Sequence, residues 1–290
     1  MEWLSRCLES IKNSTVKLNA IIIDNASVDG TQAFIKKTYS EFDLIESESN
    51  LGFGAANNIG IKKAFEQGAD SVFLLNQDAW LQPYTISELI LLAEQNKDYF
   101  VLSPLHIEAD GERLDGNFIN YLHKSKENNM LSDFILSKPK KKIYKVGFIN
   151  AAAWLVTREC YEKIGLFDGV FFHYGEDVNY CQRINYHGGK IGVVPSVKVV
   201  HDRNTYAKKK AQKLDSKVNY RKLLLVVANV NNSNFKRDFN KFLLKNLLMS
   251  VVSLLNAEKR KYYFRSFVIA FKAKNKIYNS RVKNKKQPFF

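Results

Sequence analysis

The stretch Leu74-Leu75-Asn76-Gln77-Asp78-Ala79 decides how the rest of the chain is interpreted. It ends an apolar run that begins near Ser71 and has the length and character of a strand buried on both faces. Ligands of open α/β sheets collect at the carboxyl ends of strands, where Asn76 and Asp78 stand. Their oxygens suit a hard divalent cation that also binds phosphate. Asn and Asp are common in turns as well, and the stretch taken alone favours a turn.

Length and composition favour one large domain with an appendage. The 290 residues are 46% hydrophobic and 13% aromatic, which is enough to form a full core. The three cysteines, Cys7, Cys160 and Cys181, are odd in number and lack a paired metal-type spacing. No signal peptide opens the sequence, and no apolar run approaches the roughly 20 residues of a membrane-spanning helix. We therefore expect a cytoplasmic protein that is soluble or peripheral to a membrane.

The positive charge lies in the last third of the chain. Residues 201–290 contain 23 Lys and Arg against 4 Asp and Glu, whereas residues 1–200 carry 21 against 25. The net charge of +15 is thus a property of the tail. A slightly acidic body with a strongly basic extension is indicated.

Strands and helices alternate through the first hundred residues. The expected strands are followed by helices at the spacing of βαβ units, which predicts a mostly parallel central sheet flanked by helices. Asp24 ends one such strand and should lie on the same sheet edge as Asp78. The expected strands are Leu18–Asp24, Phe42–Glu46, Ser71–Asn76 and Tyr99–Pro104, and the expected helices Thr31–Tyr39, Ala55–Gln67 and Pro83–Gln95.

Residues 107–142 lack a clear hydrophobic period, which predicts a surface excursion. Two regions after this excursion carry polar side chains that could belong to a site. Glu176 and Asp177 begin a predicted helix that runs to about Tyr186. Acidic residues in a first turn are often simply stabilised by the helix dipole. Their aromatic surroundings could instead raise one pKa toward that of a general base. His201 ends a later strand, where a surface residue and a site residue are both reasonable interpretations.

Five blocks of sequence together resemble family 2 inverting glycosyltransferases with the GT-A (Rossmann-like) fold, especially the rhamnosyltransferase-like branch. They occur in the expected order across about 200 residues, which is more specific than any single block. Gly52 and Gly54 do not complete a dinucleotide fingerprint, so a Rossmann dehydrogenase is excluded. The blocks are Ile-Ile-Asp24-Asn25-Ala-Ser27-Val-Asp29-Gly30-Thr31, Asn50-Leu-Gly52-Phe-Gly54-Ala-Ala-Asn57-Asn58, Leu-Leu-Asn76-Gln-Asp78-Ala, Phe-Phe-His-Tyr-Gly-Glu176-Asp177-Val-Asn-Tyr and Val-Val-His201.

The resemblance implies a role for each matching residue. Asp24 would contact the nucleoside of a nucleoside diphosphate sugar, with Asn25, Asn57 and Asn76 in the same donor site. Asp78 would hold Mg²⁺ or Mn²⁺ on the diphosphate, and His201 would be a further ligand. Asp177 would be the catalytic base, beside Glu176. Metal-assisted departure of the diphosphate and removal of the acceptor proton by a carboxylate then give inversion.

The sequence also departs from the family pattern. The family normally opens with a strand that ends in residues of Thr-Tyr-Asn type, and this chain starts at the helix expected after it. We therefore expect residues 1–203 to form a GT-A domain whose first strand either lies upstream or is missing from the donor site. Asn76 replaces the usual first aspartate of the Asp-x-Asp motif, so metal binding rests on Asp78.

The tail, residues 204–290, alternates apolar and basic residues with helical period. Two or three basic amphipathic helices are expected, whose apolar faces pack on the body or on one another, or contact an anionic membrane or a second copy of the chain. The segment lacks helix-turn-helix, finger and RNA-binding signatures, so a nucleic acid partner is not expected.

The leading hypothesis is a metal-dependent inverting glycosyltransferase, peripheral to the inner face of the cell membrane. Its donor would be a nucleoside diphosphate sugar, for which the family resemblance suggests rhamnose, and its acceptor a cell-surface polysaccharide or lipid-linked glycan. The alternative is an inactive sugar-nucleotide-binding or scaffold subunit of a glycan assembly complex, which the expected lack of the first strand motivates.

Overall fold

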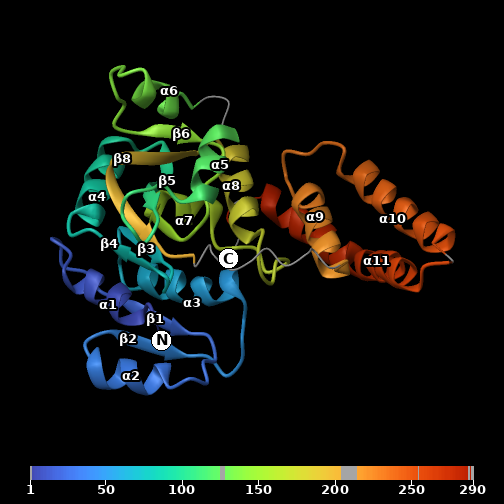
Figure 1. Cartoon of the computed structure of the whole chain (residues 1–290), viewed down its shortest axis with the longest axis horizontal. Helices are drawn as coiled ribbons and strands as arrows, with labels where there is room; N and C mark the ends of the chain where they lie inside the picture. The colour runs from blue at the N-terminus through green and yellow to red at the C-terminus, as the bar shows by residue number, and fades with distance from the viewer. Residues whose placement is uncertain (1, 125–127, 204–213, 254, 287, 289–290) are drawn as a thin grey trace.

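The computed structural model describes residues 2–124, 128–203, 214–253, 255–286 and 288. Figure 1 shows an α/β body and, to its side, a unit of three helices from the end of the chain. The predicted boundary after residue 203 adjoins residues 204–213, which are outside the described residues. No described helix combines the length and apolar character needed to cross a bilayer.

The amino-terminal half follows the predicted alternation closely. Each predicted helix and strand up to residue 107 is present within a few residues of its expected bounds. A short strand, β4, which the sequence analysis did not predict, follows Asp78. The elements are α1 Leu4–Lys12, β1 Ile21–Asp24, α2 Thr31–Thr38, β2 Asp43–Glu46, α3 Phe53–Glu66, β3 Ser71–Leu75, β4 Ala79–Leu81, α4 Thr85–Gln95 and β5 Tyr99–Ile107.

The second half of the body completes the main sheet. The predicted strand that ends at His201 is the last part of one long strand, β8, with a shift in its pairing to β5 between Val194 and Lys198. The elements are α5 Gly116–Lys124, α6 Met130–Ile135, β6 Tyr144–Val146, β7 Ala153–Thr157, α7 Arg158–Ile164, α8 Glu176–Tyr186 and β8 Lys190–His201.

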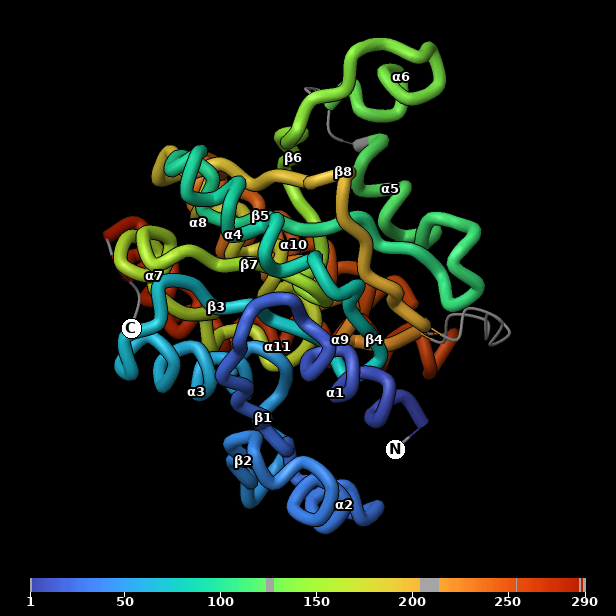
Figure 2. Tube along the Cα trace, turned by 90° about the vertical axis from the view of Figure 1, so that its left-hand side faces the viewer, coloured from blue at the N-terminus to red at the C-terminus, as the bar shows by residue number. Residues whose placement is uncertain are grey.

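The strands form a small parallel sheet and a larger sheet of mixed direction, and not one mostly parallel sheet. Parallel pairing joins β1 to β2 and β5 to β8. The main sheet has the order β3-β7-β5-β8-β4, with β6 also on β8, and its other pairs are antiparallel. β7 lies between β3 and β5, two strands that precede it in the chain, and pairs antiparallel with both. The β1–β2 sheet is separate, and in Figure 2 it lies with α2 below the main body.

Two expectations about β3 and β1 were therefore wrong. β3 is an edge strand of the main sheet and is mostly half-buried, not buried on both faces. Asp24 and Asp78 follow strands of different sheets, so they do not share one hydrogen-bonded edge. The strands that are almost wholly buried are β5, β7 and much of β8, because they lie inside the sheet.

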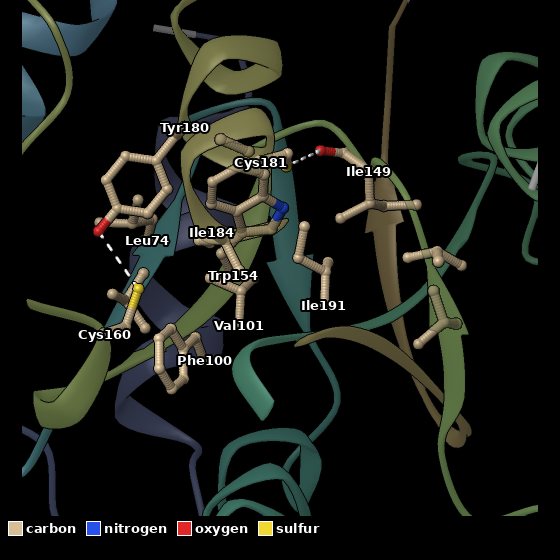
Figure 3. Packing of buried hydrophobic residues seen from close by; sticks show 14 of the residues in the cluster. Leu74, Phe100, Val101, Ile149, Trp154, Cys160, Tyr180, Cys181, Ile184 and Ile191 are labelled. Atoms are coloured by element: carbon tan, nitrogen blue, oxygen red, sulfur yellow. Dashed lines mark hydrogen bonds between the residues drawn. The ribbon is translucent and has the colours of Figure 1, made fainter. Parts of the chain in front are cut away.

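The main core lies between the sheet and α8. Trp154 of β7 and Tyr180 of α8 are fully buried there, with ring centroids 6.1 Å apart. Figure 3 shows Tyr180 directed at Cys160, with 3.5 Å between the hydroxyl oxygen and sulfur, while Cys181 points to the Ile149 carbonyl. The three cysteines are buried and unpaired, in agreement with the absence of a disulfide framework. This packing fixes the helix that begins with Glu176 and Asp177.

The surface excursion predicted for residues 107–142 contains two helices, α5 and α6. Phe118 and Leu122 of α5 and Met130 of α6 are buried in the main core. The apolar residues Phe118, Ile119, Tyr121 and Leu122 of α5 do recur at helical spacing, so the sequence carried a short signal that the prediction missed. The prediction of an irregular excursion was wrong for these helices.

The tail forms three helices, α9 Ser216–Val227, α10 Phe235–Val252 and α11 Ala257–Lys285. They share a small core that contains Val227, Phe239, Ala270 and Ile277 together with Phe171 of the body. The Arg281 guanidinium donates to backbone carbonyls of the α9–α10 connection, among them Asn232 at 2.7 Å. Part of the predicted apolar surface is thus used to hold the helices to one another and to the body.

Candidate active site

Asp78 and His201 are neighbours because β4 runs antiparallel to the end of β8. Ala79 stands opposite His201 in the register, and the Asp202 N–H donates to the Asp78 carbonyl at 2.9 Å. This arrangement places Asp78 Oδ1 3.6 Å from His201 Nε2. The two residues that the sequence predicted as metal ligands are brought together across 123 positions by one strand pair.

Asp115 is the third member of this cluster, and the sequence analysis did not identify it. Its Oδ2 lies 3.4 Å from His201 Nδ1 and accepts a hydrogen bond from Arg203 Nε at 2.5 Å. Its Oδ1 accepts from the N–H groups of Asn117 and Phe118, both at 2.8 Å, at the start of α5. Asp115 therefore joins the excursion to the end of β8 and holds His201 from the side opposite Asp78.

The charges of this cluster keep its carboxylates ionised. Burial by itself would raise the pKa of Asp78 and Asp115, but His201 and Arg203 outweigh it and lower both pKa values. Burial lowers the pKa of His201, whereas Asp115 and Asp78 raise it by a larger amount. Carboxylates held in this state are ready to bind a cation.

The donor set fits a divalent cation that a diphosphate also binds. Asp78 Oδ1 is a buried oxygen without a hydrogen-bond donor among the described residues, and the His201 imidazole faces it. Within those residues no group of three or more His, Cys, Asp or Glu is arranged to hold a metal ion. Asp78 and His201 are thus two candidate ligands, and hard cations such as Mg²⁺ take further oxygens from phosphate and water.

Asp24 and Asn25 order the turn after β1. Burial raises the pKa of Asp24, but hydrogen bonds from Gln32 Nε2 at 2.7 Å and from the Ser27 N–H at 3.1 Å outweigh it and lower the pKa. Asn25 Oδ1 accepts from the Leu51 N–H at 2.8 Å. Asn25 therefore ties the end of β1 to the glycine-bearing turn that begins α3.

Asn57 and Asn76 have simpler surroundings. Asn57 donates to the Phe53 carbonyl of its own helix at 2.9 Å. The Asn76 backbone, not its side chain, makes the described contacts, including an N–H bond to Ala152 at 2.9 Å. Their proposed roles in donor binding stay predictions. The neighbouring Asn58 is structural, because its amide both donates to and accepts from the Phe167 backbone.

Glu176 and Asp177 begin α8, where the surroundings raise the pKa values of the carboxyl groups, in contrast to those of Asp78. Burial, followed by the charge of Glu176, raises the pKa of Asp177 to about 6. Burial also raises the pKa of Glu176, whose Oε2 has no hydrogen-bond partner in the described part of the chain. Asp177 Oδ1 accepts from the Val178 N–H at 2.7 Å. A carboxylate with a pKa near 6 is suited to take a proton at neutral pH.

Close backbone packing connects the start of α8 to the turn before α3. Gly52 has φ 81°, and an added Cβ would lie 1.9 Å from the Phe172 carbonyl oxygen. A Cβ on Gly54 would lie 3.1 Å from the Phe167 Cβ and 3.4 Å from Glu176. Gly52 is needed because the turn before α3, which Asn25 holds, lies directly against the loop before Asp177. The structure thus brings Asn25, this turn and the acidic pair into one region.

The tail helices also hold the loop that precedes Asp177. Asp168 is buried and accepts hydrogen bonds from Ser280 Oγ and, at 2.7 Å, from Asn284 Nδ2 of α11. Arg221 of α9 donates to the His173 carbonyl at 3.2 Å and lies over the Tyr174 ring. Neither contact could be predicted, because each joins residues far apart in the sequence.

The comparisons with known proteins agree with this geometry. The model of glycosyl transferase family 2 matches residues 2–165, more than half of the chain. The chain belongs to glycosyl transferase family 2. It is therefore a glycosyltransferase, and the predicted family and enzyme class are confirmed. The matched residues contain Asp24, Asp78 and Asp115 and end before Asp177 and His201.

Curated relatives include rhamnosyltransferases. N-acetylglucosaminyl-diphospho-decaprenol L-rhamnosyltransferase of Mycobacterium tuberculosis is 27% identical over 220 residues, which are 69% of this chain and 72% of the relative. The dTDP-rhamnosyl transferase RfbF of Shigella flexneri is 24% identical over 184 residues, 62% of this chain and 58% of the relative. The similarity to the rhamnosyltransferase-like branch is therefore confirmed.

Solved structures confirm the GT-A fold class. GalNAc-T7 with UDP, GalNAc and Mn²⁺ has a TM-score of 0.54 at 16% identity, over 80% of this chain and 50% of that one. This chain therefore spans half the length of that structure. S. aureus TarS 1–349 in complex with UDP also has a TM-score of 0.54, at 12% identity, over 95% of this chain and 88% of that one.

Proposed function

We propose that this glycosyltransferase moves a sugar from a nucleoside diphosphate sugar to a hydroxyl group, with inversion at the anomeric carbon and with Mg²⁺ or Mn²⁺. The observation that supports this most is that the molecule contains two acidic sites whose carboxylates have opposite pKa shifts. One contains the ionised Asp78 beside His201, and the other contains Asp177 with its raised pKa. Unlike environments of two carboxylates commonly mark unlike roles in a reaction.

In the proposed reaction, Asp177 accepts the proton of the acceptor hydroxyl at Oδ2, since the Val178 N–H occupies Oδ1. The hydroxyl oxygen forms a bond to the anomeric carbon as the bond from that carbon to the diphosphate oxygen breaks, and the diphosphate leaves as an anion. A cation held by Asp78 and His201 would stabilise the charge on that diphosphate. Asp24 and Asn25 would hold the nucleoside, with Asn57 and Asn76 beside it.

We further propose rhamnose as the sugar and a cell-surface polysaccharide or lipid-linked glycan as the acceptor. Two relatives are named rhamnosyltransferases, one with a decaprenol-linked substrate and one with dTDP-rhamnose as the donor. A lipid-linked acceptor would place this chain at the inner face of the cell membrane.

Calorimetry with a panel of nucleoside diphosphates tests the donor side. We expect dTDP and dTDP-rhamnose to bind in the presence of Mn²⁺ and to bind weakly with chelator, because the carboxylates alone repel a diphosphate. Asp78→Asn should remove the difference between the two conditions. A lack of binding to every nucleotide with Mn²⁺ would contradict the proposal and favour the scaffold alternative. Binding of another base would change the donor and keep the reaction class.

A transfer assay with an isolated lipid-linked glycan tests the acceptor side. The product should carry one added sugar with the anomeric configuration opposite to that of the donor. A product with retained configuration would contradict the role of Asp177 as the base, because a single in-line displacement inverts the carbon.

A further inference from the structure

Helix α10 has an apolar face toward solvent in its second half, in addition to the side that it buries. The buried side combines Phe239 with two polar residues, Asn246, which is only 2% exposed, and Ser250. Its solvent side is a stripe of aliphatic side chains, with Val252 75% exposed. Helices of soluble domains normally bury their apolar face and expose the polar one. The stripe consists of Leu244, Leu247, Leu248, Val251 and Val252, and is continued past the helix by Leu255.

The buried polar groups of α10 are hydrogen-bonded, which supports the orientation that leaves the aliphatic stripe exposed. Asn246 donates to the Phe242 carbonyl at 2.8 Å and accepts from Asn219 of α9 at 3.0 Å. Ser250 donates to the Leu247 carbonyl at 2.6 Å. The helix is therefore fixed with its apolar stripe outward, and Figure 1 shows α10 on the side of the helical unit away from the body.

Basic side chains lie near the stripe on α10 and elsewhere on the helical unit. Lys241 and Lys245 are exposed on the turns that lead into it. On α11, exposed Phe264 and Phe271 stand among basic residues such as Lys261. Residues 216–285 contain 17 Lys and Arg against 2 Asp and Glu. Apolar side chains with a rim of lysines are the arrangement that binds anionic lipid surfaces, where the cations meet headgroups and the aliphatic groups enter the acyl boundary.

We propose that the stripe on α10 and its basic rim attach this protein to an anionic membrane. The inference adds to the proposed function, since a surface-bound enzyme would be held beside a lipid-linked acceptor. The contacts of α9 and α11 with the loop before Asp177 connect the attached unit to the candidate base.

The basic charge and the aliphatic stripe together argue against two other partners for this face, a second copy of the chain and nucleic acid. Two copies of the chain that met through this face would bring together two helical units that each carry 17 Lys and Arg against 2 Asp and Glu, and like charges repel. Nucleic acid would use the lysines and leave the aliphatic stripe in water, because phosphate contacts need no apolar area. An anionic bilayer satisfies both the charge and the stripe.

Flotation of the whole chain with vesicles tests the proposal. We expect it to float with an equal mixture of phosphatidylcholine and phosphatidylglycerol and to stay in solution with phosphatidylcholine alone. The triple variant Leu244→Ser, Leu248→Ser and Val252→Ser should lose at least about tenfold in affinity. The matched control Leu91→Ser, Ile135→Ser and Leu136→Ser removes exposed apolar side chains of the body and should bind as the unchanged chain does.

Charge variants and a transfer assay separate the remaining explanations. Lys241→Gln and Lys245→Gln should each reduce affinity about fivefold. Full vesicle binding by the triple variant would overturn the proposal, as would a dimer that this variant dissociates in the absence of vesicle binding. Transfer to a water-soluble acceptor without vesicles should be equal in the triple variant and the unchanged chain. Vesicle binding without any transfer would refute the proposed function alone.

Discussion

The two acidic regions of this molecule contain carboxylates in opposite states. At the end of β8, Asp78 and Asp115 are held ionised because His201 and Arg203 outweigh their burial. At the start of α8, Asp177 has few compensating contacts, so burial and the neighbouring Glu176 raise its pKa to about 6. The same side-chain type is thus prepared as an anion in one place and as a proton acceptor in the other.

This difference shows that the charges and burial around a carboxylate, and not the residue type, determine whether it suits cation binding or proton transfer. A carboxylate that stays charged suits cation binding, and one with a pKa close to neutral suits proton transfer. Variants that interchange or remove these surroundings should therefore have separable effects on donor binding and on turnover.

Asp177→Asn should have the largest effect. The amide keeps the size of the side chain and cannot accept the proton, so we expect kcat to fall by about a thousandfold. Steady-state transfer rates measure this, with donor affinity by calorimetry as the control. A large loss of donor affinity with little change in kcat would place Asp177 in donor binding and break the contrast between the regions.

Asp78→Asn should weaken metal-dependent donor binding by about a hundredfold, because it removes the charged ligand of the cation. Calorimetry with Mn²⁺ measures the loss. In chelator, the variant should bind at least as tightly as the unchanged chain, because it lacks one of the negative charges that repel the diphosphate. Equal affinity with Mn²⁺ would show that the ion, if used, is held elsewhere.

Asp115→Asn should have a smaller effect, about tenfold on metal-dependent donor binding, since Asp115 acts by positioning His201. Asparagine keeps an oxygen for the Asn117 and Phe118 N–H groups, so the start of α5 is preserved. A metal titration followed through donor binding measures the effect. The control is Asp110→Asn, an exposed carboxylate of the same segment that pairs with Arg113. An equal loss in both variants would contradict the positioning role.

The pH dependence of kcat/KM should show the smallest shift. Asp177 must be deprotonated to act, so the rate should fall about tenfold per pH unit below about 6. Glu176→Gln keeps the burial and removes one negative charge, so the acidic limb should move to lower pH by less than about one unit. An unchanged limb would show that Glu176 does not set the pKa of the base.

The local order of helices and strands was predictable from the sequence, and the arrangement of the strands was not. Apolar runs bounded by turn residues identified β1, β2, β3 and β5. The pairing of β3 and β5 depends on β7, which follows them in the chain and inserts between them. α5 and α6 were missed although the apolar residues of α5 recur at helical spacing, because both helices are short and lie among polar and charged residues.

The candidate site residues that could be predicted are those that end or follow a strand or begin a helix. Asp78, Asp177 and His201 stand at such positions and carried the family resemblance. Asp115 gave a weaker signal, an acidic residue inside the predicted excursion, and only the fold brings it to His201. The Asp168 contacts with α11 join residues more than a hundred positions apart and have no local signal.

The separate β1–β2 sheet has a consequence for the order in which the molecule opens. Two strands of four residues each are marginal as a cooperative unit, whereas the main sheet is continuous through β3, β7, β5 and β8. Amide protons of β1 and β2 should therefore exchange with solvent before those of β5 and β8. A nucleotide that contacts both Asp24 and Asp78 would stabilise the β1–β2 sheet against opening when it binds. Amide protons of β1 should then exchange more slowly, which gives a measurement of nucleotide binding.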